Sequence, residues 1–353
     1  MLNYDLRKGF SMKELISERR LPSLLSREEM LGILQREEYG FMPAPPEKIS
    51  FSKKAMRSDN DFCGKGKMWE ITITCTVKNK EFSFPVSLML PSGEGPHPFF
   101  VNLSFEENVP NFYFPAEEIL DNGFGAFNLY FNDVTKDNDD FTDGLAGIFY
   151  PDGKRNDTDC GKIALWAWAA SRVLDYAETE PRLDMTRAAV CGHSRLGKTA
   201  LVAGAFDHRF RFVHSNDSGC SGASIARGNT GETVSDICRV FPYWFCESYK
   251  KYPGNEENMP FDQHFLLACI APNFVTVGSA SEDDWADPTG EQLSCFAASP
   301  AFDNGFKCDK VAEVGEAFFG GDIAYHLRKG KHAFTRQDWH RLIEFVNLTS
   351  EKK

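Results

Sequence analysis

The sequence lacks any run of apolar residues that approaches the roughly 20 needed to cross a bilayer as a helix, so we expect no membrane partner. It also lacks an excess of positive charge, because 39 Lys and Arg face 51 Asp and Glu and leave a net charge of -12. Nucleic-acid binding depends on basic residues that displace phosphate counterions, so we expect no nucleic-acid partner either.

A targeting signal and paired cysteines are missing as well. The first ten residues, M-L-N-Y-D-L-R-K-G-F, have neither the apolar core nor the small-residue cleavage site of a signal peptide. We therefore expect a cytoplasmic protein, or a secreted one whose leader has been removed. The ten cysteines stand singly, with no C-x-x-C pair and no zinc-type histidine spacing. Free thiols and no metal site are the expectation.

The composition is that of an ordinary globular protein, with 42% hydrophobic and 25% charged residues. A chain of 353 residues can bury a large core, and α/β folds of this size occur as one domain. We expect a single domain over residues 1–353, made of an N-terminal helical extension (1–45) and a catalytic core (46–353). In the extension, S-R-E-E at 26–29 is a capping box that predicts a helix to about Glu37.

The order of the predicted elements favours an α/β fold. Residues 51–90 alternate in the manner of antiparallel strands at a sheet edge. From Pro96 onward strands alternate with helices, which predicts a mostly parallel central sheet in a three-layer α-β-α sandwich. The polar loops 132–154 and 219–238 are long, as loops near active sites often are. Strands are expected at 98–103, 123–131, 188–191, 212–216 and 273–279, and helices at 115–121, 162–177, 199–206 and 336–347.

The stretch 187–201, R-A-A-V-C-G-H-S-R-L-G-K-T-A-L, has two possible meanings. In one, Ser194 is a nucleophile on the sharp strand-to-helix turn of an α/β-hydrolase, with Gly192 two residues before it. In the other, residues 192–199 match G-x-x-x-x-G-K-[ST], the loop of P-loop nucleotide-binding proteins. The hydrolase motif departs from G-x-S-x-G, because Leu196 occupies the place of the second glycine and Gly197 follows it.

The rest of the chain favours the hydrolase. A nucleotide-binding loop needs a later apolar strand that ends in an Asp for Mg²⁺, and F-V-H-S-N-D at 212–217 is a poor candidate. A hydrolase of this kind needs a Ser, an acid and a His in that order. The chain supplies Ser194, then Asp217 or Asp283, and then His332 in a loop before the last helix. Among the other histidines, His326 is the main rival of His332.

Four blocks in order carry a family resemblance: G-H-S-R-L-G-K, N-D-S-G-C-S-G, S-E-D-D-W-A-D-P and G-K-H, preceded by the helix W-A-W-A-A-S-R-V-L-D-Y. Together they resemble the bacterial branch of the glucuronoyl esterases (carbohydrate esterase family 15), in the α/β-hydrolase superfamily. The resemblance covers about residues 96–347. It implies Ser194 as nucleophile and His332 as its base. Asp217 stands at the family's acid position, commonly Glu, and is our preferred triad acid, with Asp283 as its assistant or substitute.

The resemblance also implies the binding residues. The backbone N–H of Arg195 would serve the oxyanion hole, and its side chain would lean toward the oxyanion. Lys198, Glu232 and Trp285 match positions that contact the sugar, where they would supply a donor, an acceptor and an apolar wall. Arg227 could add positive potential to the same loop, although no definite partner can be assigned to it.

The function that follows is a serine esterase that needs no cofactor or metal. It would cleave the ester between (4-O-methyl)glucuronic acid and an alcohol, as in lignin-carbohydrate esters, through an acyl-enzyme. The expected partner is a small or oligosaccharide glucuronate ester, and the expected state is a monomer. Alternatives are an esterase of acetylated carbohydrates, such as acetyl xylan, a P-loop nucleotide-binding protein and an inactive sugar-binding relative. His193 stands where many fungal relatives carry a disulfide-forming Cys, so that bridge cannot form here.

Overall fold

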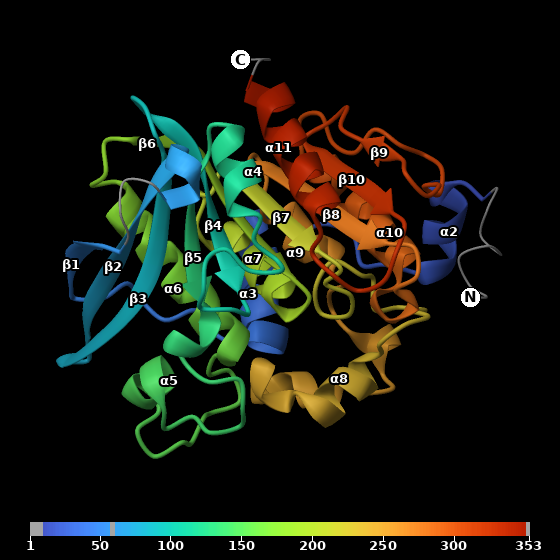
Figure 1. The fold of residues 1–353 in the computed structure, drawn as a ribbon. Coiled ribbons are helices and arrows are strands. Elements are labelled where there is room, and N and C mark those ends of the chain that lie inside the picture. Colours follow the sequence, from blue (N-terminus) through green and yellow to red (C-terminus); the bar gives the residue numbers. More distant parts are fainter. Residues whose placement is uncertain (1–9, 57–60, 351–353) are drawn as a thin grey trace.

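Ten strands form one sheet in the order β1-β2-β3-β5-β4-β6-β7-β8-β10-β9 (Figure 1). The computed structural model describes residues 10–56 and 61–350. Strands β4, β5, β6, β7, β8 and β10 are parallel to their neighbours in this group, whereas β1, β2, β3 and β9 pair antiparallel. The strands are β1 Lys48–Ala55, β2 Gly66–Val77, β3 Lys80–Pro91, β4 His97–Ser104, β5 Gly125–Tyr130, β6 Leu183–His193, β7 Phe212–Asn216, β8 Phe274–Ala280, β9 Ala317–Phe318 and β10 Ile323–Arg328.

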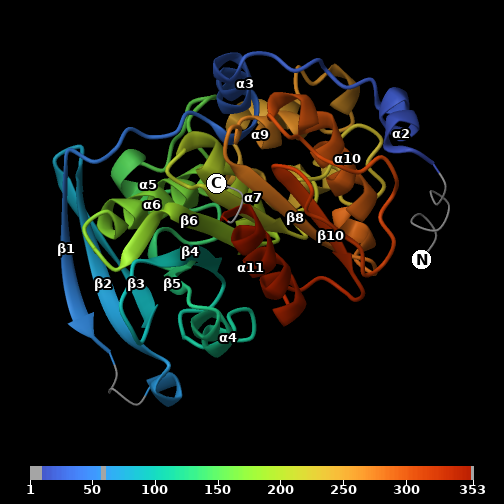
Figure 2. The same ribbon diagram turned by 90° about the horizontal axis from the view of Figure 1, so that it is seen from above.

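Helices cover both faces of the sheet, as Figure 2 shows from above. Apolar side chains of α4 and α11 fill one core beneath β4 and β6, and those of α6, α7, α9 and α10 fill the larger core on the other face. The α-helices are α2 Met12–Arg19, α3 Arg27–Leu34, α4 Ala116–Asp121, α5 Gly144–Phe149, α6 Lys162–Ala177, α7 Arg195–Phe206, α8 Val234–Val240, α9 His264–Ala268, α10 Pro288–Ala298 and α11 Arg336–Ser350.

The mostly parallel, three-layer α/β-hydrolase architecture expected from the sequence is therefore confirmed. The antiparallel strands β1 to β3 lie at one edge of the sheet, as the alternation in residues 51–90 predicts (Figure 1). The capping box at Ser26 is formed with Glu29, and a π-helical turn, Gln35–Tyr39, extends α3. The predicted bounds of α6 agree with the structure. No helix within the described ranges is long and apolar enough to cross a membrane.

Two elements around the site differ from the sequence-based prediction. Helix α7 begins at Arg195 rather than at Thr199, because the turn at Ser194 leads straight into the first helical residue. Strand β10 was not predicted at all. Its sequence, I-A-Y-H-L-R, carries a His and an Arg that interrupt the apolar run, yet all six residues are buried. Buried polar residues of this kind need specific partners, and those partners lie in the site.

Candidate active site

Ser194 lies on a sharp turn between β6 and α7. Its backbone has φ 57° and ψ -127°, a conformation that is strained for an L-residue. Gly192 makes the turn possible, because a Cβ there would lie 2.2 Å from the carbonyl oxygen of Leu196. Gly197 faces β7, where a Cβ would meet Ser218 at 3.0 Å. The turn therefore needs glycine at position 192.

The P-loop alternative is contradicted by the same turn. The N–H groups of Gly197 and Lys198 donate to the carbonyl of Ser194 at 2.9 and 3.2 Å, so they are used inside the helix. A phosphate-binding loop needs such N–H groups free to cradle a phosphate. The ammonium of Lys198 donates to the carbonyl of Ser218 and is buried. The resemblance to the nucleotide-binding motif is thus confined to the letters of the sequence.

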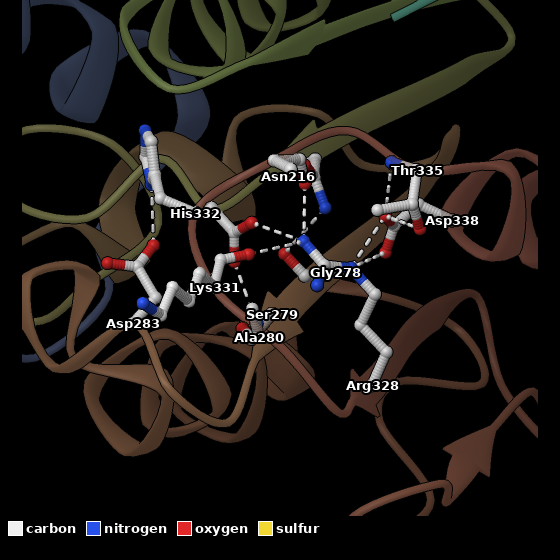
Figure 3. Close-up of polar contacts among 12 residues, drawn as sticks. Asn216, Gly278, Ser279, Ala280, Asp283, Arg328, Lys331, His332, Thr335 and Asp338 are labelled. Atoms are coloured by element: carbon white, nitrogen blue, oxygen red, sulfur yellow. Dashed lines mark hydrogen bonds and ion pairs between the residues drawn. The ribbon is translucent and has the colours of Figure 1, made fainter. Parts of the chain in front are cut away.

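His332 lies in the loop between β10 and α11 and pairs with Asp283, which follows β8. Nδ1 of His332 is 2.5 Å from Oδ2 of Asp283, and Figure 3 shows the two side chains facing each other. A carboxylate can only accept, so Nδ1 carries the proton and Nε2 is left as a base. The imidazole is 43% exposed, whereas Asp283 is buried. Among hydrogen bonds of the described residues, none yet joins Ser194 Oγ to His332; such contacts often tighten only with substrate.

Asp217 does not pair with His332, which corrects our preference for it as the triad acid. Its side chain turns away into the protein, where Oδ1 accepts from the N–H of Ala280 at 2.7 Å. Oδ2 accepts from Nη2 of Arg328 at 3.1 Å. Burial raises the pKa of Asp217, the charges of Glu291 and Asp283 add to the effect, and the charge of Arg328 opposes it. The short Asp side chain at this position is engaged before it can reach the imidazole.

His326, the main rival of His332, and His193 are both held in structural contacts. His326 is buried and lies 2.9 Å from Asp338, against the ring of His214. His193 packs its ring 4.3 Å from that of His332 and 5.6 Å from that of Tyr113. Burial lowers the pKa of His193 to about 3, and His332 adds to the shift. His193 is therefore neutral, and its ring packs against that of His332 at the end of β6.

Arg195, the first residue of α7, has its side chain fixed by an acidic and three aromatic side chains. Its Nη1 donates to Oδ2 of Asp137, and its guanidinium lies over the rings of Phe105, Phe241 and Trp244 at 5.0 to 5.6 Å. Trp244 Nε1 donates to the other oxygen of Asp137 at 2.6 Å. The N–H of Arg195 is among the first of the helix, which have no partner within it. The side chain is thus anchored on one edge, while Nε is a buried donor with no partner among the described residues.

Lys198, Glu232 and Trp285 come together beside this turn, as predicted. Nζ of Lys198 lies 3.9 Å from Oε2 of Glu232, and the N–H of Glu232 donates to the carbonyl of Trp285 at 2.8 Å. Burial raises the pKa of Glu232, and Lys198 opposes the shift. Trp285 is 56% exposed as a residue, which is unusual for tryptophan and excludes simple core packing. Arg227 is instead a structural residue, because it pairs with Asp262 and donates to the carbonyls of Phe261 and Met259.

Sequence reasoning missed the residues that support this site: Asp137, Glu291, Arg328 and Asp338. Glu291 accepts from the N–H groups of Ser218 and Gly219 at 2.8 and 2.9 Å. Burial raises its pKa to about 7. It thereby holds the loop whose carbonyl binds Lys198. Asp137 could have been suspected, because it stands in the loop 132–154 expected to border the site. Nothing in the sequence marks the other three.

Asp217, Asp283 and His332 are the one group among the described residues whose ligand atoms could hold a metal ion, all within 4.8 Å of one another. Their arrangement does not favour a cation. The Nδ1–H of His332 already donates to Asp283, and the guanidinium of Arg328 touches Asp217. A metal would have to displace one hydrogen bond and approach a fixed positive charge.

Known proteins resemble this chain both in sequence and in fold. Residues 73–304 match the family model described as glucuronyl esterase, fungi. The chain is 40% identical over 240 residues to carbohydrate esterase MZ0003 of an unknown prokaryotic organism, covering 65% of this chain and 55% of that protein. It is 30% identical over 271 residues to a 4-O-methyl-glucuronoyl methylesterase of Podospora anserina, covering 73% and 51%. The solved structure of a glucuronoyl esterase from Solibacter usitatus superposes with a TM-score of 0.83 at 33% identity, covering 91% of both chains.

The chain spans about half the length of these two curated relatives but nine tenths of the bacterial structure. A fungal structure, from Hypocrea jecorina, superposes less closely, with a TM-score of 0.69 at 26% identity over 91% of this chain and 82% of that one. The family model matches well over half of the chain. The chain belongs to the glucuronoyl esterase family, carbohydrate esterase family 15, on its bacterial branch.

Proposed function

We propose that this protein is a serine esterase that hydrolyses esters of glucuronic acid, with or without a 4-O-methyl group, and releases an alcohol. The observation that carries the proposal is the strained Ser194 at the start of α7, whose neighbour His193 packs its ring 4.3 Å from that of His332, the partner of Asp283. A serine hydroxyl is a weak nucleophile unless a base removes its proton, and His332 has its Nε2 available for that task.

The reaction follows from these positions. Ser194 Oγ attacks the ester carbonyl while its proton moves to Nε2 of His332, and Asp283 stabilises the imidazolium. Negative charge develops on the carbonyl oxygen near the N–H of Arg195, where helix α7 begins and its dipole is favourable. The tetrahedral intermediate collapses, His332 gives its proton to the leaving alcohol, and Ser194 holds the acyl group. Water repeats the sequence and releases the uronic acid.

The substrate class is inferred from the neighbouring polar groups. Lys198 can donate and Glu232 can accept hydrogen bonds from ring hydroxyls, while the exposed indole of Trp285 offers an apolar face to a sugar. An acetyl ester would use none of them at the acyl side. Curated relatives are named 4-O-methyl-glucuronoyl methylesterases, which supports the same class. We also propose that the enzyme is a monomer, which size-exclusion chromatography with light scattering would test.

The test compares the wild type with Ser194→Ala on methyl glucuronate and on an acetylated sugar. Ser52→Ala, at an exposed position in β1, is the matched control. We expect hydrolysis of the uronate ester by the wild type and the control, and a loss of about 10⁴-fold or more in Ser194→Ala. Preference for the acetyl ester would contradict the substrate class. Turnover that survives Ser194→Ala would contradict the mechanism, and a wild type without turnover that is stabilised by glucuronate would indicate a binding protein.

A further inference from the structure

The loop that carries His332 is anchored at its C-terminal end, where Phe334 is buried and Thr335 donates to Asp338. Residues 329–335 join β10 to α11 without helix or strand, and the imidazole is 43% exposed. Among hydrogen bonds of the described residues, the ring makes one, to Asp283. A general base must be held within a fraction of an ångström of its working position. Contacts to the backbone of this loop therefore decide where the base stands.

One guanidinium contacts the backbone on both sides of His332. Nη2 of Arg328, the last residue of β10, donates to the carbonyl of Lys331 at 3.0 Å and also to that of Ala333. These two residues flank His332 directly. Nη1 adds a longer hydrogen bond of 3.4 Å to the carbonyl of Lys329. The side chain of Arg328 is 2% exposed and lies at the centre of the contacts in Figure 3.

Two carboxylates balance this buried cation. Nε of Arg328 donates to both oxygens of Asp338, at 3.0 and 2.7 Å, and Nη2 lies 3.1 Å from Oδ2 of Asp217. Asp217 is itself fixed by the N–H of Ala280. A buried arginine is tolerated only with such partners, and its planar set of N–H donors can serve several acceptors at once.

The same strand end also ties the two halves of the catalytic pair together. The N–H of Ser281 donates to the carbonyl of Arg328 at 2.9 Å, and the N–H of Glu282 donates to that of Gly330 at 2.8 Å. The backbone that leads to Asp283 is thus hydrogen-bonded to the backbone that leads to His332. A shift of Arg328 would move the imidazole relative to both Ser194 and Asp283.

We propose that Arg328 is a positioning residue for His332, and that Asp217 takes part in the reaction by holding Arg328 rather than by contacting the imidazole. The inference rests on the proposed function, because it requires His332 to be the base for Ser194. It assigns a role to the carboxylate at the family's acid position that the pairing of Asp283 with His332 leaves open.

Two isosteric variants test the role of the counter-charges. Asp217→Asn and Asp338→Asn each remove one of the two negative charges beside Arg328 and keep an acceptor oxygen at that position. Asp338 bonds to Arg328, His326 and Thr335 and does not belong to the group formed by Asp217, Asp283 and His332. A loss in Asp338→Asn would therefore reflect the positioning of the loop and not a contact with the imidazole. We expect each variant to lower kcat on methyl glucuronate about 10-fold, with KM changed by less than about twofold. A loss in Asp217→Asn with none in Asp338→Asn would overturn the proposal, since Asp217 would then act on His332 directly.

Arg328→Lys keeps the charge but not the planar fork. We expect kcat to fall about 100-fold, again with little change in KM. Arg172→Lys is the matched control, a buried arginine of α6 paired with Asp175 at 2.5 Å, and we expect it to lose stability without losing kcat. The double variant Asp217→Asn/Arg328→Lys should be no slower than Arg328→Lys alone, because both changes disrupt the same set of hydrogen bonds around Arg328. Multiplied losses would contradict the shared role.

The outcomes separate the two proposals. If Arg328→Lys does not fold, the comparison of Asp217→Asn with Asp338→Asn decides whether Arg328 positions His332. An active wild type, inactivated by Ser194→Ala but unaffected by Arg328→Lys, would overturn the positioning role and leave the esterase in place. A wild type without esterase activity would overturn both.

Discussion

Replacing Asp283 by Asn removes the carboxylate that bonds to His332 and keeps the shape of the side chain. The bond is short, 2.5 Å, and the acid is buried, so it is a strong charge-assisted hydrogen bond. An Asn amide can donate to Nδ1, which moves the proton to Nε2 and removes the base. In a serine protease the corresponding change lowers kcat about 10⁴-fold.

Asp217 sets how much of this loss the protein can recover. Its carboxylate is within 4.8 Å of the imidazole, and at an effective dielectric constant of 20 a lone charge at that distance would contribute about 3 kcal/mol. Its charge is already balanced by Arg328 at 3.1 Å, so little of this remains. We therefore expect a loss of about 10³- to 10⁴-fold in kcat for Asp283→Asn, or about 4 to 5.5 kcal/mol.

The assay is steady-state hydrolysis of methyl glucuronate at neutral pH. Glu282→Gln is the control, because it removes one negative charge from the exposed neighbour of Asp283. It should change kcat by less than about twofold, as expected of a surface charge. A loss in Asp217→Asn as large as that in Asp283→Asn, or a loss below about 10-fold in Asp283→Asn, would refute the assignment of the acid.

Three further predictions follow from other features. Ser194→Gly should be more stable to urea than Ser194→Ala by about 1 kcal/mol, because glycine accepts the φ of 57° without strain; equal stabilities would contradict the strained turn. Burial raises the pKa of Glu38 from 4.5 to about 8, so the folded state keeps a proton that the unfolded state has lost across this window. Its contribution to stability is full below about pH 4.5 and falls by up to about 1.4 kcal/mol per pH unit toward pH 8. The change in melting temperature caused by Glu38→Gln should thus be more favourable at pH 8 than at pH 5. The same change at both pH values would contradict this prediction. Dialysis against EDTA should leave kcat unchanged, because Asp217, Asp283 and His332 are engaged in hydrogen bonds; a loss restored by a divalent ion would show a metal site.

Local patterns predicted much of the fold because they report local physics. The apolar and small residues of α6 mark a helix that is buried along most of its length, and its predicted bounds agree with the structure. The Ser26 capping box closes as its spacing requires. Strand β10 was not predicted because its polar residues are buried with partners from elsewhere in the chain. His326 and Arg328 both pair with Asp338, a residue of α11. Periodicity carries no information about such partners.

The order of Gly192, Ser194 and the later His332 along the chain predicted the nucleophile and the base, because hydrolases of this fold require that order. The sequence also placed Lys198, Glu232 and Trp285 in one site. The sequence could not show which acid bonds to His332, because this depends on how the folded chain directs the two side chains. Both candidate acids follow parallel strands, and the choice depends on side-chain direction: Asp217 turns inward to the N–H of Ala280 and to Arg328, whereas Asp283 faces the imidazole.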